Sequence, residues 1–135
     1  MQTRLQYLTM SDTRLLQTSL SFEPGWMTVA LFSQQQCAFC EEVREHYLKP
    51  MRAARRAGIA FAEFELNGMR RVVSWAGRSM TEAEFARERG AKFAPTVMFF
   101  GTAGESLAPT IVGLSRDFFG AYLDERIQIA SKAVG

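Results

Sequence analysis

The sequence has 135 residues, of which 47% are hydrophobic and 22% charged, and its formal net charge is +2. A chain of this length is long enough for one domain with a hydrophobic core and too short for two. The near balance of charge and the shortness of the apolar runs exclude a basic tract for nucleic acid, a polybasic membrane-surface segment and stable membrane insertion.

Residues 1–26 are expected to form an N-terminal extension that packs on a domain made by residues 27–135. The apolar residues of this extension favour a strand or a short helix at the edge of a sheet: Leu15, Leu16, Leu20 and Phe22. Charged residues interrupt these apolar pieces, so the extension lacks the long apolar region of a secretory signal. We therefore expect either a cytoplasmic protein or the processed form of a longer one.

The apolar run 27–32 predicts a buried strand, and the segment after the cysteines predicts a helix that opens with two glutamates. Pro50 lacks a backbone donor, so we expect a kink or a new helical turn there, and Gly58 is expected to end the helix. The alternating run 59–66 predicts a second strand. The order strand, helix, strand implies a parallel pair joined by a right-handed crossover.

Residues 69–80 have no periodicity that favours a helix or a strand. Thr81 follows them, and Thr81 with Glu84 forms the capping box of a helix that runs to Gly90.

The run 97–100 predicts another buried strand, followed by a glycine-rich turn and a hairpin partner at 107–112. Pro109 is expected to disturb this pairing near an edge of the sheet. Ser115 is expected to cap the last helix. Four apolar residues recur on that helix at helical spacing and predict the face that packs on the sheet: Phe119, Leu123, Ile127 and Ala130.

The chain contains two cysteines, and both lie in the tetrapeptide Cys37-Ala38-Phe39-Cys40, between the first strand and the first helix. This spacing places Cys37 at the helix N-terminus, where the positive end of the helix and its unpaired N–H groups favour a thiolate. Cys40, one turn later, would resolve a mixed disulfide formed on Cys37. The pattern therefore predicts a redox-active dithiol.

Two other roles for the cysteines stay open. A structural disulfide is one, although such a short loop removes little entropy from the unfolded chain. A metal site is the other, but structural zinc needs four ligands and only His46 adds to the two thiols, at a spacing that fits no finger pattern. A metal shared between two chains would supply the missing ligands. We expect no metal and no cofactor besides the Cys37–Cys40 disulfide.

The order strand, helix, strand, helix, hairpin, helix, with the cysteine pair at the first junction, resembles the thioredoxin-fold thiol-disulfide oxidoreductases over roughly residues 27–130. Three segments carry the resemblance: Ala30–Ser33 leading into Cys37–Cys40, Gly90–Phe100 around Pro95, and Val112–Ser115. The resemblance implies an α/β thioredoxin-like fold, with a central mixed sheet of four or five strands and helices on both faces.

By this resemblance the Ala94–Pro95 bond would be cis, and Pro95 would pack against Cys37 and Cys40 and complete the catalytic centre. Ala94 would offer backbone hydrogen bonds to an extended substrate, and Gly113 would leave room for its backbone, although an ordinary turn glycine explains Gly113 equally well. The insertion 73–81 is similar to that of bacterial members often exported to the periplasm, including thioredoxin-like proteins of sulfur-oxidation clusters. A processed form would thus lie in the periplasm.

The chain departs from housekeeping thioredoxins at the buried aspartate and flanking tryptophans, whose positions read Leu31, Ser33 and Gln36. Glu63, where thioredoxins place a lysine, is a possible proton acceptor for Cys40. If its side chain points inward beneath the disulfide, loss of water would favour the protonated carboxyl near neutral pH. Alternatively, Glu63 is a solvated or salt-bridged strand residue.

We expect a protein-disulfide reductase in which Cys37 attacks a substrate disulfide, Cys40 releases the product, and an upstream thiol donor restores the dithiol. The Ala-Phe pair between the cysteines has no charge and no histidine, which favours a reductase over an oxidase. Phe39 is expected to form an apolar lip that protein substrates touch. The alternative is a non-enzymatic redox-sensing or partner-binding module. In either case we expect a monomer that binds no nucleic acid.

Overall fold

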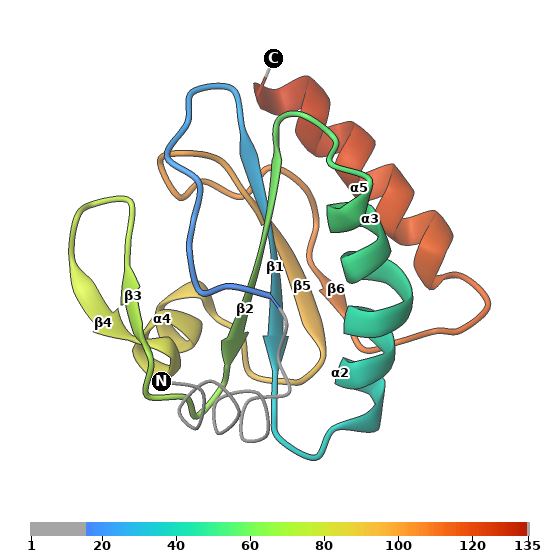
Figure 1. Cartoon of the computed structure of the whole chain (residues 1–135), viewed down its shortest axis with the longest axis horizontal. Coiled ribbons are helices and arrows are strands. Elements are labelled where there is room, and N and C mark those ends of the chain that lie inside the picture. Colours follow the sequence, from blue (N-terminus) through green and yellow to red (C-terminus); the bar gives the residue numbers. More distant parts are fainter. Residues whose placement is uncertain (1–15, 135) are drawn as a thin grey trace, which may run out of the picture.

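A computed structural model describes residues 16–134 of the chain (Figure 1). Its centre is a four-stranded sheet in the order β2-β1-β5-β6. Strand β1 (Met27–Ser33) pairs in parallel with β2 (Ile59–Glu65) and antiparallel with β5 (Thr96–Phe100), which pairs antiparallel with β6 (Ile111–Val112). The predicted mixed sheet is confirmed, with four strands.

Helices cover both faces of this sheet. The helical segments α2 (Ala38–Val43), η1 (Arg44–Leu48) and α3 (Lys49–Ala53) follow one another along the chain, and α5 (Phe119–Val134) lies beside them (Figure 1). Buried residues of η1 and α5 share one core cluster with alternate residues of β1 (Met27, Val29 and Leu31). Two residues that alternate with them on β1, Ala30 and Phe32, share a second cluster with α4 (Glu82–Arg89). Because side chains of a strand point alternately to opposite faces, β1 contributes to both clusters.

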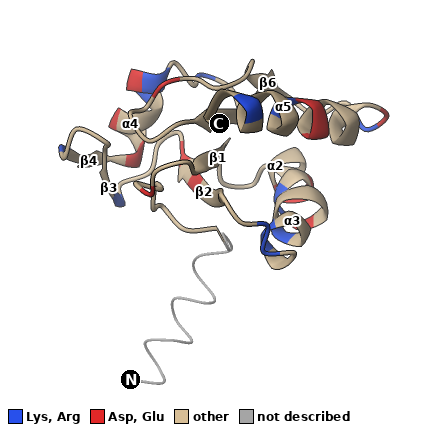
Figure 2. Cartoon of the chain, turned by 90° about the horizontal axis from the view of Figure 1, so that it is seen from above, with Lys and Arg blue, Asp and Glu red and all other residues tan. Residues whose placement is uncertain are grey.

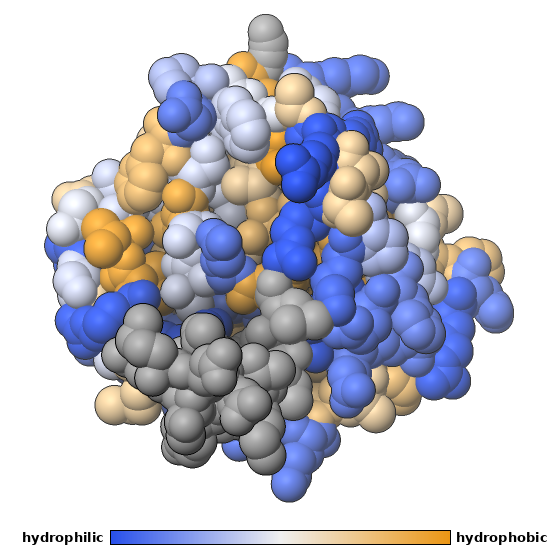
Figure 3. All heavy atoms as spheres, in the orientation of Figure 1, coloured by the Kyte–Doolittle hydropathy of each residue, from blue (hydrophilic) through white to orange (hydrophobic). Residues whose placement is uncertain are grey.

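The stretch without a predicted structure forms a small hairpin of β3 (Arg71–Val73) and β4 (Ser79–Thr81) beside the main sheet. The ring of Trp75 in its turn packs 5.8 Å from the ring of Phe85 and 5.1 Å from that of Phe100, measured between centroids. Figure 3 shows apolar side chains at the surface over this hairpin, where Val73 is exposed. Packing on the core, rather than local propensity, thus holds the hairpin.

Three predicted boundaries are wrong. The first helix ends at Ala53, and Arg55 and Gly58 then adopt left-handed φ values of 53° and 86°. The last helix begins at Phe119 after a turn, in which the carbonyl of Ser115 accepts the N–H groups of residues 118 and 119 at 3.1 and 2.7 Å. The predicted partner of β5 is interrupted rather than continuous. Ser106 forms an antiparallel bridge with Phe100 and the Leu107 N–H donates to the Phe99 carbonyl at 2.8 Å, but only residues 111–112 form a strand, with Pro109 between the two paired stretches.

The N-terminal segment from residue 16 packs along the outer edge of β2. Gln17 forms a parallel bridge with Ala62, and its carbonyl accepts the N–H of Glu63 at 2.8 Å. Leu16 is buried in the first core cluster and Leu20 in the second. Leu15, named with them as an edge residue, lies outside the described residues.

Charges of both signs are interspersed along α4 and α5 (Figure 2). Within residues 16–134, none of the helices combines the length and the apolar character needed to cross a membrane.

Candidate active site

The two cysteines lie at the start of α2, immediately after the loop that leaves β1. Gln36 adopts a left-handed φ of 56° and turns the chain into Cys37, which is the N-cap of the helix. The structure joins Cys37 and Cys40 by a disulfide, with their Cα atoms 5.2 Å apart. Cys37 is half-buried, whereas Cys40 has no exposed surface. Because Cys37 is the more exposed of the two, its sulfur is the one that a thiol from outside can reach, and the one that can reach a disulfide of another molecule.

The helix N-terminus is directed at Cys37. The Cys40 N–H donates a hydrogen bond to the Cys37 sulfur over 3.2 Å, so this sulfur takes the place of an oxygen cap. In the reduced protein a thiolate at the same position would accept this N–H and face the positive end of α2. Both effects stabilise the charged form of a cysteine and increase its reactivity at neutral pH.

The segment around Pro95 lies at the same end of the sheet as the cysteines. The Ala94–Pro95 peptide bond is cis. Thr96, the next residue, pairs with Phe32 near the end of β1, from which the chain continues to Cys37. The carbonyl of Pro95 accepts the N–H of Gly113 at 2.7 Å. The loop after β1, the segment before β5 and the residue after β6 therefore lie at the same end of the sheet.

Gly113 has a left-handed φ of 82°, and no atom lies within 4 Å of the position that a Cβ would occupy. Open space beside this glycine is compatible with an approaching backbone, but its φ value alone also explains the residue.

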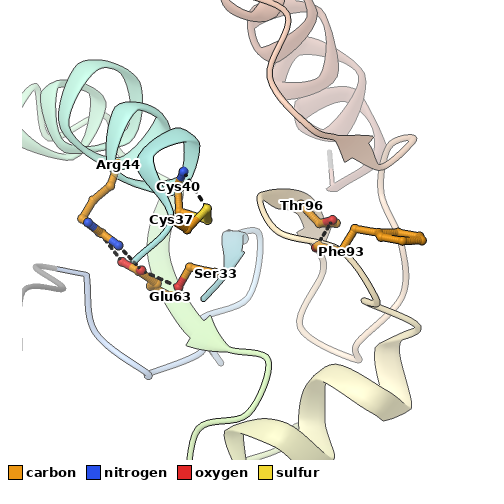
Figure 4. Close-up of a disulfide and its surroundings, with 7 residues drawn as sticks. All are labelled: Ser33, Cys37, Cys40, Arg44, Glu63, Phe93 and Thr96. Atoms are coloured by element: carbon orange, nitrogen blue, oxygen red, sulfur yellow. Dashed lines mark hydrogen bonds and ion pairs between the residues drawn. A yellow bond between two sulfur atoms is a disulfide. The ribbon is translucent and has the colours of Figure 1, made fainter. Parts of the chain in front are cut away.

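Exposed apolar side chains come from the start of α2, the segment before Pro95, the end of β6 and the turn before α5: Phe39, Phe93, Val112 and Phe118. Figure 4 shows the Phe93 side chain beside Thr96, whose hydroxyl donates to the Phe93 carbonyl over 2.6 Å.

Arg116 links the loop before α5 to the cysteine-bearing helix. Its guanidinium donates to the Glu42 carboxylate at 3.1–3.3 Å and lies 5.6 Å from the centroid of the Phe39 ring. The hydrogen bond from Arg116 lowers the pKa of Glu42 below its ordinary value of 4.5. Arg116 thus lies over the aromatic ring that stands between the two cysteines.

Glu63 points inward and is completely buried, as one of the two predicted alternatives required. It also forms a salt bridge, as the second alternative stated. Its carboxylate accepts hydrogen bonds from Arg44 Nε at 2.8 Å, Arg44 Nη2 at 2.6 Å and the Ser33 hydroxyl at 2.7 Å (Figure 4). The hydrogen bonds to Glu63 raise the pKa of Arg44 above its usual value, against the opposing effect of burial.

Sequence reasoning missed Arg44 and Arg116. For Arg44 a signal was present, because it follows Cys40 by four residues and so lies one helical turn further along the same side. No signal in the sequence pointed to Arg116, because 74 residues separate it from its partner Glu42.

Among the described residues, no group of three or more His, Cys, Asp and Glu side chains could hold a metal ion. His46, the residue considered as a third ligand, is exposed on η1.

Residues 23–125 match the sequence model of a family described as thioredoxin-like domain. The chain belongs to this family. A thioredoxin-like domain with a disulfide of CxxC spacing at a helix N-terminus supports a thiol-disulfide redox function.

Solved structures resemble this thioredoxin-like domain at low sequence identity. A thioredoxin-fold protein from Helicobacter pylori is 16% identical with a TM-score of 0.56, and the match covers 92% of this chain and 88% of that one. A thioredoxin of Nicotiana alata is 17% identical with a TM-score of 0.55, covering 92% and 85%. The mitochondrial thioredoxin 3 of Saccharomyces cerevisiae is 18% identical with a TM-score of 0.52, covering 76% of each chain.

These likenesses show the thioredoxin fold. No curated protein sequence matches the chain significantly.

Proposed function

We propose that the chain is a protein-disulfide reductase that uses the Cys37/Cys40 dithiol. The observation that supports this most is the asymmetry of the pair: Cys37 is half-buried at the N-cap of α2 and Cys40 is enclosed one turn further on. An accessible sulfur beside a helix N-terminus attacks, and an enclosed sulfur within its reach resolves.

The reaction has two exchange steps. The Cys37 thiolate attacks one sulfur of the substrate disulfide, a bond forms between the two sulfurs, and the other substrate sulfur leaves as a thiolate that takes a proton from solvent. Cys40 then loses its proton and attacks the Cys37 sulfur, which releases the second substrate thiolate. The substrate gains two electrons and two protons, and the protein is left as the disulfide. A dithiol donor upstream must return it to the reduced form.

The loops around the disulfide are the proposed substrate site. Ala94 would offer its backbone to an extended segment that lies across Pro95, and Gly113 would leave room for that segment. Phe39 would supply apolar contact. Reduction rather than oxidation is favoured because neither Ala38 nor Phe39 brings a charge or an imidazole to the cysteine pair.

The test compares the wild-type protein with Cys37→Ser and Cys40→Ser in the reduction of insulin by a dithiol. We expect both variants to lose the acceleration. Cys40→Ser should accumulate a mixed disulfide on Cys37, detectable by mass spectrometry and also informative about the substrate. A wild-type protein no faster than free dithiol would contradict the proposal and favour a redox-sensing or partner-binding module.

Equilibration with glutathione buffers tests the direction separately. A potential close to that of thioredoxin, about −270 mV, supports a reductase, whereas a value close to that of DsbA, about −120 mV, would overturn this assignment.

A further inference from the structure

The part of the chain that the structure describes has three buried charged side chains: Arg44, Glu63 and Glu82. Glu82 belongs to α4, which packs on the other face of the sheet from α2. Arg44 and Glu63 are 4% and 0% exposed, and they form a two-pronged ion pair. Because burial of charge is costly, a pair kept in a domain core needs an explanation beyond stability.

The pair lies between the two chain segments that flank the cysteines. Ser33, which donates to Glu63, is the last residue of β1 and precedes Cys37 by four positions. Arg44 follows Cys40 by four positions, and its backbone N–H donates to the Cys40 carbonyl. Glu63 on the neighbouring strand β2 thus ties together the segment before the disulfide and the helix after it. Figure 4 shows these three side chains grouped on one side of the cysteine pair.

Both carboxylate oxygens of Glu63 already accept hydrogen bonds, three in all, from Arg44 and Ser33. A free proton acceptor would not be held in this way. The other charges that act on Arg44 are Glu41 on α2 and Glu45 on η1, and their effect is weaker than that of Glu63.

We propose that Arg44 and Glu63 are positioning residues that set the reduction potential of the Cys37–Cys40 pair by keeping the net charge beside it at zero. The inference rests on the proposed function, because a potential has a role only if the dithiol exchanges. In the intact pair the fields of the cation and the anion largely cancel at the sulfurs. Removal of one partner leaves the other charge buried and uncompensated, and its field is weakly screened in the interior.

The two halves of the pair should therefore act in opposite directions. Glu63→Gln leaves the Arg44 cation, which stabilises a cysteine thiolate and hence the reduced protein, so the protein becomes more oxidising. Arg44→Met leaves Glu63 without its cation, and at alkaline pH, where the buried carboxyl is ionised, this anion disfavours the thiolate and makes the protein more reducing. A purely structural role would weaken folding in both variants without this change of sign.

The experiment measures the equilibrium constant of each variant with glutathione at alkaline pH, together with the thiolate fraction of Cys37 from ultraviolet absorbance. We expect a shift of roughly tenfold in opposite directions for Glu63→Gln and Arg44→Met, equivalent to about 30 mV each for a two-electron couple. The double variant, which is neutral at both positions, should return to within about threefold of the wild type. Glu88→Gln, which makes the same charge change in an exposed pair with Arg78, is the matched control and should not shift the constant.

Ser33→Ala covers the case in which a single charge variant does not fold. This variant removes one donor from Glu63, so the carboxylate acts more strongly on the cysteines, and the constant should move in the direction of Arg44→Met by about two- to threefold. Shifts of the same sign in both charge variants, or no shift in Ser33→Ala, would overturn the inference while the proposed function stands. A wild-type protein that does not equilibrate with glutathione would overturn the proposed function itself.

Discussion

Phe39 stands between the two cysteines with half of its surface exposed, and its ring lies under the guanidinium of Arg116. The same guanidinium is fixed by the carboxylate of Glu42. An aromatic side chain has few rotatable bonds to immobilise when a partner binds, which is why such residues contribute strongly to protein contacts. At the scale of single residues, we therefore propose Phe39 as a contact for a protein substrate.

We predict that Phe39→Ala lowers kcat/KM for a protein disulfide about five- to tenfold, which corresponds to about 1–1.4 kcal/mol of lost contact energy. Reduction of a small disulfide such as glutathione disulfide should be unchanged, because a small substrate does not reach across the ring.

Phe22→Ala is the matched control for this measurement. Phe22 has nearly the same exposure, 53% against 50% for Phe39, but precedes β1, whereas the cysteines follow it at the opposite end of that strand. An equal loss on protein and small substrates in Phe39→Ala would show instead that the ring acts on the cysteine chemistry.

At the scale of elements, α4 has well-defined signals at both ends. Thr81 accepts the N–H of Glu84 at 3.1 Å, Glu84 accepts the N–H of Thr81 at 2.8 Å, and Gly90 ends the helix with a left-handed φ of 79°. This helix carries Phe85, which is packed among other aromatic rings of the second core cluster. The caps therefore stabilise the helix that places Phe85 in that core.

Thr81→Ala should lower the free energy of unfolding by about 1 kcal/mol, because one backbone N–H of the first turn loses its acceptor. Chemical denaturation at neutral pH measures this loss. Thr81→Ser keeps the hydroxyl and should retain most of the stability.

The capping box also predicts a pH dependence. The hydrogen bond from the Thr81 N–H lowers the pKa of Glu84 below its ordinary value of 4.5. A carboxyl whose pKa is lowered by folding stabilises the protein above its unfolded-state pKa, and this stabilisation is lost as the pH falls through the folded-state pKa. Glu84→Gln should therefore flatten the loss of stability below pH 4.5 while preserving the box at neutral pH. If the variant loses stability below pH 4.5 as steeply as the wild type, Glu84 does not contribute to this pH dependence.

At the scale of the whole molecule, the sheet separates two core clusters, and the segment at the edge of β2 contributes to both. Leu16 packs in the cluster under η1 and α5, and Leu20 packs in the cluster under α4. Between them, Gln17 pairs with β2 and covers main-chain groups of an edge strand. Residues that precede the family match at residue 23 are thus part of the packed domain.

We predict that Leu16→Ala and Leu20→Ala each lower the free energy of unfolding by about 2–5 kcal/mol, as expected for a buried leucine. Because the two side chains pack in different clusters, the losses should add to within about 0.5 kcal/mol in the double variant. Ser19→Ala, at an exposed position between them, is the control and should change little. Strong non-additivity would show that the two clusters behave as one.

Local signals identified the strand before the cysteines, the helix after them and the capping box of α4, because each depends on residues within one or two turns. The resemblance to thioredoxin-fold proteins added the mixed sheet with helices on both faces and the cis bond before Pro95. The boundaries that were wrong, at Gly58 and Ser115 and along β6, lie where turns are set by neighbours in space. The hairpin of β3 and β4 could not be predicted, since Trp75 is held by rings from other elements.

The sequence by itself determined that a thiol pair follows a buried strand and begins a helix, because hydrophobic period and cysteine spacing are local properties. Only the tertiary structure decided what surrounds that pair. Glu63 meets Arg44 and Ser33 across 19 and 30 residues of chain, and Arg116 meets Glu42 across 74. Whether a charge is buried and which partner it finds depend on the packing of separate elements, and no local pattern of residues encodes such a contact.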